Sequence, residues 1–153
     1  MPLFIGDESS DNRKVEHWRE LVTDADAYVI ASPEYHHALP AILKNAFDHL
    51  DEDELRGKVV LLLGATTGRF GTIQAQHSLY PILRTFGVWL FPDEIFIPRG
   101  DKTMDAEGNL TDQKLADRFQ TIVGCFIESA KAINDLRDQR QATTVDEDGK
   151  KHC

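Results

Sequence analysis

The sequence predicts one α/β domain built on a parallel sheet, and three observations lead to this prediction. Apolar residues alternate between helical spacing and short continuous runs, in the order helix, strand, helix, strand, helix, strand, helix. The run Val59 to Leu63 is apolar at every position, which is typical of a strand covered on both faces. A length of 153 residues is also the usual size of one domain.

The first two elements are expected to be a helix and a strand. Apolar residues recur at helical spacing over 11–23, and Ser10 or Asp11 is placed to cap the start of this helix. The apolar, β-branched run 27–31 follows, and Pro33 closes it. We therefore expect 27–31 to form a buried strand.

The middle of the chain is expected to form two further helix and strand pairs. Pro40 suits the first turn of a helix that runs roughly over 40–50, and the charged segment 51–57 is expected to be a solvated connection to the strand 59–63. A third helix is expected around 79–86.

Prolines and charge mark the later part of the chain. Pro81 lies inside the third helix, where we expect a kink or an irregular first turn. The extended region 88–97 is broken by Pro92 and Asp93, and 99–109 is expected to be a loop.

A long last helix is expected after Thr111 or Asp112, because one apolar face is kept from Leu115 to Ile133. Beyond it the apolar content falls almost to zero. We therefore expect a domain over 1–137 and a disordered polar tail over 138–153.

Composition limits the partners and the compartment. The chain has 17 Lys and Arg against 26 Asp and Glu, a net charge of −9, which argues against nucleic acid or an anionic membrane as partner. Two cysteines without a CxxC pair, and no visible secretion signal, fit a reducing cytoplasm. Cys125 is expected to be a small core residue.

The carboxyl ends of the predicted strands are the expected ligand site, because parallel α/β sheets bind ligands there. These ends are 32–37 and 64–71. His36, His37 and Glu34 invite a metal interpretation, but neighbouring side chains point in different directions and no further ligand is spaced nearby, so we expect no metal. The glycines of 64–71 do not match GxGxxG and lack the lysine of a P-loop.

One segment carries a specific resemblance. Residues 32–50 read SPEYHHALPAILKNAFDHL, which resembles the (S/T)PEY(N/H)-x-x-x-P-x-x-LKNA-x-D motif of the NADPH-dependent FMN reductase family. The resemblance extends over roughly 3–137. It implies a flavodoxin-like parallel sheet with helices on both faces, and FMN and NADPH as cofactors.

The resemblance also implies where the flavin lies. The first loop would line the edge of the isoalloxazine ring mostly through backbone atoms, and the second would approach the ring from the neighbouring strand. Arg69 would contact a phosphate or ribose of NADPH or only water, and Tyr35 could instead pack at a subunit contact. No catalytic side chain is expected, because hydride transfer requires stacking of nicotinamide on flavin. The implied ring-binding residues are Pro33, Glu34, Tyr35, His36, Thr66, Thr67, Gly68, Arg69 and Phe70.

Two functions remain open on this basis. The first is a flavin-dependent oxidoreductase that passes hydride from NADPH to FMN, or through FMN to a quinone-like small-molecule acceptor, as a homodimer or homotetramer. Family members begin with a strand, a phosphate-binding loop, a helix and a second strand that have no counterpart here, so we expect an N-terminally truncated fold with about three strands and four helices. The alternative is therefore a truncated, non-catalytic relative that acts as a partner-binding protein or is a gene fragment.

Overall fold

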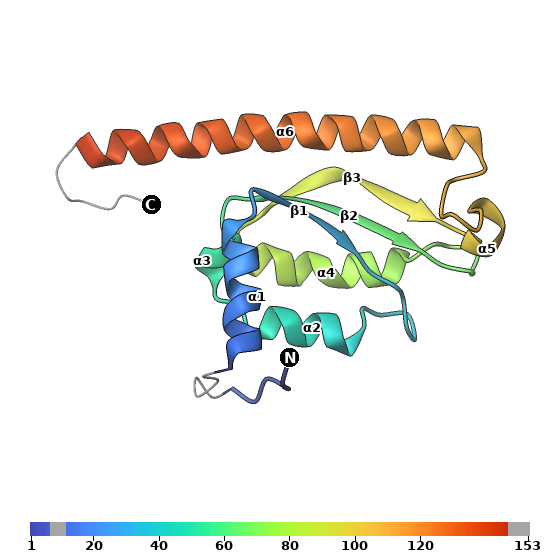
Figure 1. Cartoon of the computed structure of the whole chain (residues 1–153), viewed down its shortest axis with the longest axis horizontal. Coiled ribbons are helices and arrows are strands. Elements are labelled where there is room, and N and C mark those ends of the chain that lie inside the picture. The colour runs from blue at the N-terminus through green and yellow to red at the C-terminus, as the bar shows by residue number, and fades with distance from the viewer. Residues whose placement is uncertain (7–11, 147–153) are drawn as a thin grey trace.

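The computed structural model describes residues 1–6 and 12–146, with only the backbone described for 141–146. Its centre is a parallel sheet of three strands in the order β1 (Ala27–Ala31), β2 (Val59–Ala65) and β3 (Trp89–Ile97), as Figure 1 shows. Helices separate the strands along the chain. The predicted α/β class and the parallel sheet are therefore confirmed.

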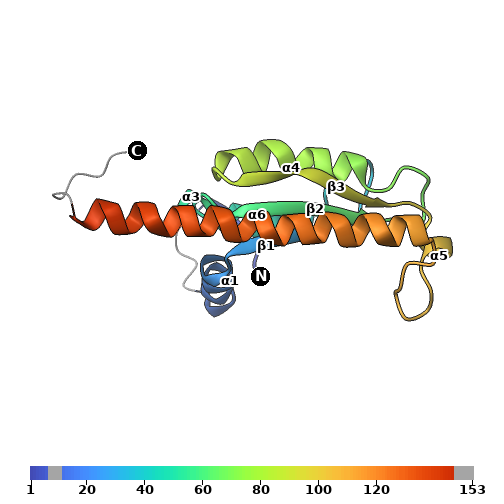
Figure 2. The same ribbon diagram turned by 90° about the horizontal axis from the view of Figure 1, so that it is seen from above.

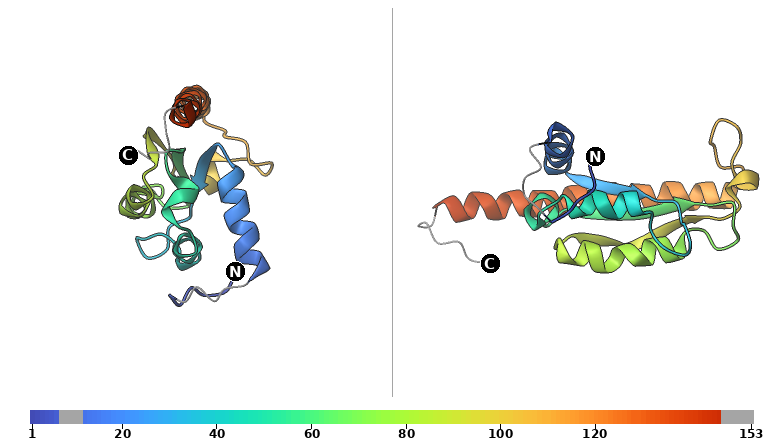
Figure 3. Two further views of the ribbon diagram at one scale, coloured as in Figure 1. Left: turned by 90° about the vertical axis from the view of Figure 1, so that its left-hand side faces the viewer. Right: turned by 90° about the horizontal axis from the view of Figure 1, so that it is seen from below.

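Helices cover both faces of the sheet. On one face lie α1 (Arg13–Asp24), α2 (Ala41–Asp48) and α4 (Ile73–Thr85), which bury a core with Val60 and Leu62 of β2. On the opposite face α6 (Gln113–Asp146) packs on a second core (Figures 2 and 3). Trp18 fixes α1 to α2, because its indole Nε1 donates a hydrogen bond to the carbonyl of Ala46 at 2.9 Å.

The central strand is buried and the first strand is not. In β2 the residues from Val59 to Leu62 are buried, as a strand covered on both faces requires. In β1, Val29 is 49% exposed, because α6 packs mainly against β2 and β3 and leaves part of β1 uncovered. The prediction that 27–31 is a buried strand is therefore right about the strand and wrong about its burial.

Two connections contain short helices instead of the expected loops. The charged segment after α2 forms α3 (Glu52–Leu55), where the Asp51 backbone amide donates to the Glu54 carboxylate at 2.5 Å. The segment after β3 forms α5 (Gly100–Thr103). Asn12 caps α1 by accepting a hydrogen bond from the Lys14 amide at 3.0 Å, whereas the expected caps Ser10 and Asp11 lie outside the described residues.

Pro81 and Pro92, which were expected to disturb a helix and a strand, each lie inside a continuous element. Pro81 lies inside α4, which is helical without interruption from Ile73 to Thr85. Pro92 lies inside β3, and the pairing of β3 with β2 shifts register next to it, between Val60 and Leu62. A β-bulge therefore accommodates this proline without dividing the strand.

The last helix is longer than expected. α6 continues to Asp146, so secondary structure does not end at 138, and the expected disorder of 138–146 is wrong for the backbone. Residues 147–153 lie outside the described part of the chain. Cys125 lies on the exposed side of α6 and is not a core residue, because the face of α6 turned to the sheet is formed by its neighbours Ile122 and Phe126.

Candidate functional site at the carboxyl ends of the strands

The chain makes a tight and strained turn directly after β1. Tyr35 and Ala38 exchange two backbone hydrogen bonds, each 3.1 Å long. The two residues between them, His36 and His37, have φ values of 51° and 61°. Two consecutive left-handed residues are the pattern of a type I′ turn, and each non-glycine residue held there costs about 1–2 kcal/mol. Strained backbone of this kind concentrates at functional sites.

The loop after β2 is held from the side by the end of β3. The Thr66 amide donates to the carbonyl of Ile97 at 3.0 Å, and the Gly100 amide donates to the carbonyl of Thr66 at 2.8 Å. The Arg99 amide also donates to the carbonyl of Gly68 at 2.9 Å. These backbone contacts hold the loop at Thr66 and Gly68.

Gly64 allows the two strand ends to pack closely. A Cβ atom at this position would lie 1.8 Å from Thr72 Oγ1 and 2.7 Å from the Ser32 carbonyl oxygen. Only glycine fits so close an approach of backbone and a buried threonine. The ends of β1 and β2 and the start of α4 are therefore packed against one another below the loops.

Glu34 joins the two loops. One carboxylate oxygen, Oε2, accepts hydrogen bonds from the backbone amides of Gln74 at 2.9 Å and Ala75 at 3.2 Å. These amides belong to the first turn of α4, where unpaired N–H groups and the helix dipole favour a negative charge. The other oxygen, Oε1, lies 3.6 Å from Nδ1 of His37. The turn after β1 is thereby attached to the helix that follows the second loop.

The structure brings all nine expected ring-binding residues to this one edge of the sheet. Most of them are exposed, including two aromatic side chains, Tyr35 at 62% and Phe70 at 77%. Glu34 and Thr66 are only partly exposed. The Glu34 carboxylate accepts from the start of α4, and the Thr66 hydroxyl accepts a hydrogen bond from the Gly68 amide.

Sequence reasoning missed the residues that support this edge. Arg99 supports the second loop from a left-handed conformation, with φ 51°, and no local sequence signal marks it. Gly64 carried a usable signal, since glycine is unusual inside an apolar strand and often marks a close approach. Asn45 of the motif binds elsewhere: its side chain accepts from the Phe4 amide at 2.8 Å and donates to the Pro2 carbonyl at 2.9 Å.

The edge fits the ring of a flavin. A planar ring with hydrogen-bonding groups along one side requires a fixed backbone edge and flat apolar neighbours. The turn 35–38 supplies the edge, and the exposed rings of Tyr35 and Phe70, one from each loop, supply the neighbours. A phosphate group is a different matter. The first turn of α4 is a typical place for phosphate in such folds, but here the Glu34 carboxylate already occupies it.

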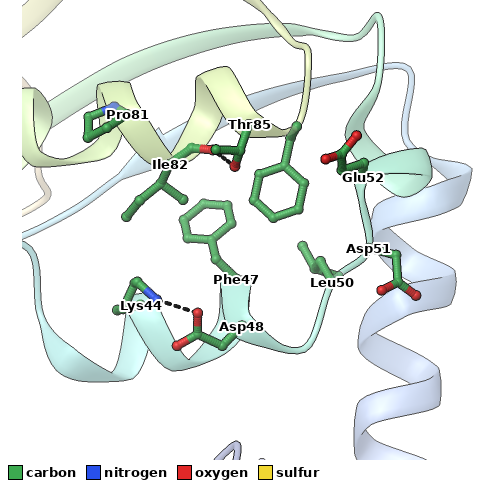
Figure 4. A pocket seen from close by; sticks show the side chains of 10 residues that line it. Lys44, Phe47, Asp48, Leu50, Asp51, Glu52, Pro81, Ile82 and Thr85 are labelled. Atoms are coloured by element: carbon green, nitrogen blue, oxygen red, sulfur yellow. Dashed lines mark hydrogen bonds and ion pairs between the residues drawn. The ribbon is translucent and has the colours of Figure 1, made fainter. Parts of the chain in front are cut away.

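A separate hollow lies at the other end of the helices, between the carboxyl ends of α2 and α4 (Figure 4). Its volume is about 510 Å³, and Phe47, Leu50 and Ile82 form part of its apolar lining. Lys44 on its rim forms an ion pair with Asp48. The hollow contains none of the nine expected residues, so the predicted site and this cavity are distinct.

Two absences can be stated for the described part of the chain. No helix there combines the length and the apolar character that a membrane span needs. Residues 1–6 and 12–146 also contain no group of three or more His, Cys, Asp or Glu side chains that could hold a metal ion.

A parallel sheet with helices on both faces defines the class of open α/β proteins, in which ligands bind at the carboxyl ends of the strands. Residues 1–102 match the family described as NADPH-dependent FMN reductase, and the chain belongs to this family. The predicted flavodoxin-like fold is thereby confirmed.

Similar proteins include several named reductases. An NAD(P)H-dependent FMN reductase of Pseudomonas aeruginosa is 38% identical over 110 residues, which cover 69% of this chain and 60% of that protein. A quinone reductase of Escherichia coli strain K12 is 35% identical over 142 residues, covering 86% of this chain and 76% of the relative. The chain thus corresponds to less than two thirds of the first relative.

A solved structure agrees with these sequence matches. The flavoenzyme FerB, an NAD(P)H:(acceptor) oxidoreductase from Paracoccus denitrificans, superposes with a TM-score of 0.76 at 25% identity. The superposition covers 86% of this chain and 76% of FerB.

Proposed function

We propose that the protein is a flavin-dependent oxidoreductase that takes hydride from NADPH and passes it to FMN, or through bound FMN to a quinone-like acceptor. The observation that carries this proposal is the edge at the carboxyl ends of β1 and β2. There a strained turn and a neighbouring loop present two exposed aromatic side chains, Tyr35 and Phe70, inside the region that matches the family.

The proposal assigns FMN to this edge. Pro33, Glu34, Tyr35 and His36 hold the ring from the first loop, mostly by backbone atoms, and residues 66–70 contact it from the second. FMN supplies a ring that accepts a hydride and gives up its electrons again. The protein's part is to orient this ring and leave one face open for nicotinamide, so no side chain is assigned an acid or base role.

The finer details of the proposal follow from the relatives. The quinone reductase of Escherichia coli supports a quinone-like acceptor, and the names of the relatives support either NADPH or NADH as donor. We include a cytoplasmic location and a homodimer or homotetramer in the proposal. The acidic composition supports the absence of nucleic acid and anionic membrane as partners.

The test combines flavin binding with turnover. The purified chain is titrated with FMN by flavin fluorescence, and NADPH oxidation is then followed with FMN or 1,4-benzoquinone as acceptor. Phe70→Ala is expected to weaken FMN binding about tenfold, because stacking on an aromatic side chain is worth about 1–3 kcal/mol. Trp89→Ala removes another exposed aromatic ring, 60% exposed at the start of β3, and should leave FMN binding unchanged.

Two results would contradict the proposal in different ways. A chain that folds cooperatively but neither binds FMN nor oxidises NADPH would overturn the proposal and favour the non-catalytic, partner-binding alternative. Equal effects of Phe70→Ala and Trp89→Ala on FMN binding would refute the assigned edge while leaving the activity in place.

A further inference from the structure

Glu34 spans two structural elements that are far apart in the sequence. It follows β1, yet its carboxylate accepts hydrogen bonds from the amides of Gln74 and Ala75, about forty residues later. α4 has no side-chain cap of its own, since Thr72 at its start makes no capping hydrogen bond and its first turn contains no acidic residue. Glu34 therefore supplies, from another loop, the cap that most helices obtain from their own N-terminal residue.

The same carboxylate is held against the strained turn. Its side chain is only 17% exposed, and its second oxygen lies 3.6 Å from Nδ1 of His37, one of the two left-handed residues. One oxygen thus faces the turn and the other faces the helix. Movement of the turn relative to the loop 66–71 would have to break the contact with α4.

We propose that Glu34 is a positioning residue, whose carboxylate fixes the turn 35–38 relative to the loop 66–71 by capping α4, so that both loops meet the same flavin ring. This inference rests on the proposed function for its ligand, whereas the positioning itself is a property of the protein alone. The side chain of Glu34 is therefore not a flavin ligand, although the backbone of Glu34 lies in the proposed ring-binding loop.

The position of this carboxylate has a second effect on the site. Helix N-termini at the carboxyl ends of parallel strands are ordinary binding places for phosphate, because their N–H groups and dipole attract anions. In this protein a fixed negative charge fills that place on α4. A phosphorylated ligand is thus directed to lie here with its ring and not with its phosphate.

The chain offers a matched control for Glu34. Asp112 caps α6 in the same manner, since its Oδ1 accepts hydrogen bonds from the amides of Lys114 at 2.9 Å and Leu115 at 3.1 Å. It caps its own helix and joins no two loops. Asp112→Ala therefore removes a comparable helix cap without releasing the turn 35–38.

The first experiment needs no ligand. Backbone amide shifts and hydrogen exchange are compared by NMR in the wild type, Glu34→Ala, Glu34→Gln and Asp112→Ala. We expect Glu34→Ala to speed exchange at least fivefold at the Gln74 and Ala75 amides and also in the turn 35–38, and Glu34→Gln, which keeps an acceptor oxygen, to restore most of the protection. Asp112→Ala should change only the start of α6. Unchanged exchange in the turn of Glu34→Ala would overturn the proposal.

The second experiment uses riboflavin, which carries the ring without a phosphate. Glu34→Ala is expected to weaken riboflavin binding about tenfold and to shift the flavin absorption bands, whereas Glu34→Gln stays within about threefold of the wild type and Asp112→Ala has the affinity of the wild type. Riboflavin binding that is equal in Glu34→Ala and wild type would also overturn the positioning role. A wild type that binds neither riboflavin nor FMN would refute the proposed function, and the exchange experiment would still decide the role of Glu34.

Discussion

The two ends of the sheet use their polar groups in different ways. At the amino end the buried ammonium group of Lys58 donates hydrogen bonds to the carbonyls of Val22 at 2.8 Å and Thr23 at 2.6 Å, and the Tyr28 hydroxyl donates to the carbonyl of Val22 as well. At the carboxyl end the turn at His36 and His37 is exposed and strained, and the loop residues 67–70 are exposed. The polar groups of the amino end are thus paired within the fold, whereas most of the proposed flavin-binding residues at the carboxyl end are exposed.

The cavity between α2 and α4 lies away from the proposed flavin site. The hollow between α2 and α4 has a volume within the range of ligand pockets, but its charged rim is paired internally by Lys44 with Asp48 and by Arg56 with Glu52. The proposed flavin site therefore rests on the strained turn and the exposed aromatic side chains, and not on cavity volume.

The largest effect is expected at the close packing below the loops. Gly64→Ala should lower the free energy of unfolding by about 3 kcal/mol, because the new Cβ would overlap Thr72 Oγ1 and the Ser32 carbonyl oxygen. Urea unfolding followed by tryptophan fluorescence measures this change. Gly68→Ala is the matched control and should cost less than about 0.5 kcal/mol, since its nearest neighbours would lie 3.5 Å away or farther. Equal losses for both variants would show that the strand ends are not tightly packed.

A smaller effect is expected at the amino end and depends on pH. Burial raises the pKa of Tyr28 from 10.0 to about 12. The protonated hydroxyl therefore stabilises the folded state fully below pH 10, and this contribution is lost as pH rises through about 12. Tyr28→Phe should cost about 1 kcal/mol below pH 10, the usual value of one hydrogen bond, and the difference from wild type should shrink above it.

Unfolding curves of the two proteins at several pH values test this prediction. The pKa of Tyr80 is also raised to about 12, by burial and by its hydrogen bond to Glu94. Tyr80 is present in both proteins, so its effect cancels in the comparison. A difference that is constant with pH, or one that grows, would contradict the assigned role of Tyr28.

The smallest effect is expected at the hollow. Lys44→Gln removes a largely solvent-exposed ion pair with Asp48, which is worth less than about 0.5 kcal/mol, and should leave FMN affinity unchanged. Urea unfolding and FMN titration measure both quantities. A loss of FMN affinity as large as that of Phe70→Ala would move the flavin site from the carboxyl edge to this hollow.

Much of the fold could be predicted because it depends on local patterns. The strand 27–31 and the start of the strand at Val59 follow from continuous apolar runs bounded by proline and glycine. The burial of β1 could not be predicted, because it depends on where α6 lies across the sheet. The extension of α6 past 138 has little apolar patterning to indicate it, although Gln139 and Arg140 are good helix formers.

The site could be predicted only in outline. The resemblance of 32–50 indicated the first loop but not the left-handed turn at His36 and His37, because only a few per cent of non-glycine residues adopt this conformation. The contact of Glu34 with α4 joins residues about forty positions apart, and no spacing rule reveals it. The resemblance thus named Glu34 as a site residue, but it did not reveal the contact of Glu34 with α4.

The bulge in β3 makes the two borders of the sheet unequal as places for a further strand. Within the described residues β1 and β3 form its two borders, and β3 carries Pro92 and a shift of register, both of which hinder the addition of another strand. β1 has a regular register over its five residues and no such obstacle. A further strand, whether from this polypeptide or from another, would therefore pair more readily with β1 than with β3.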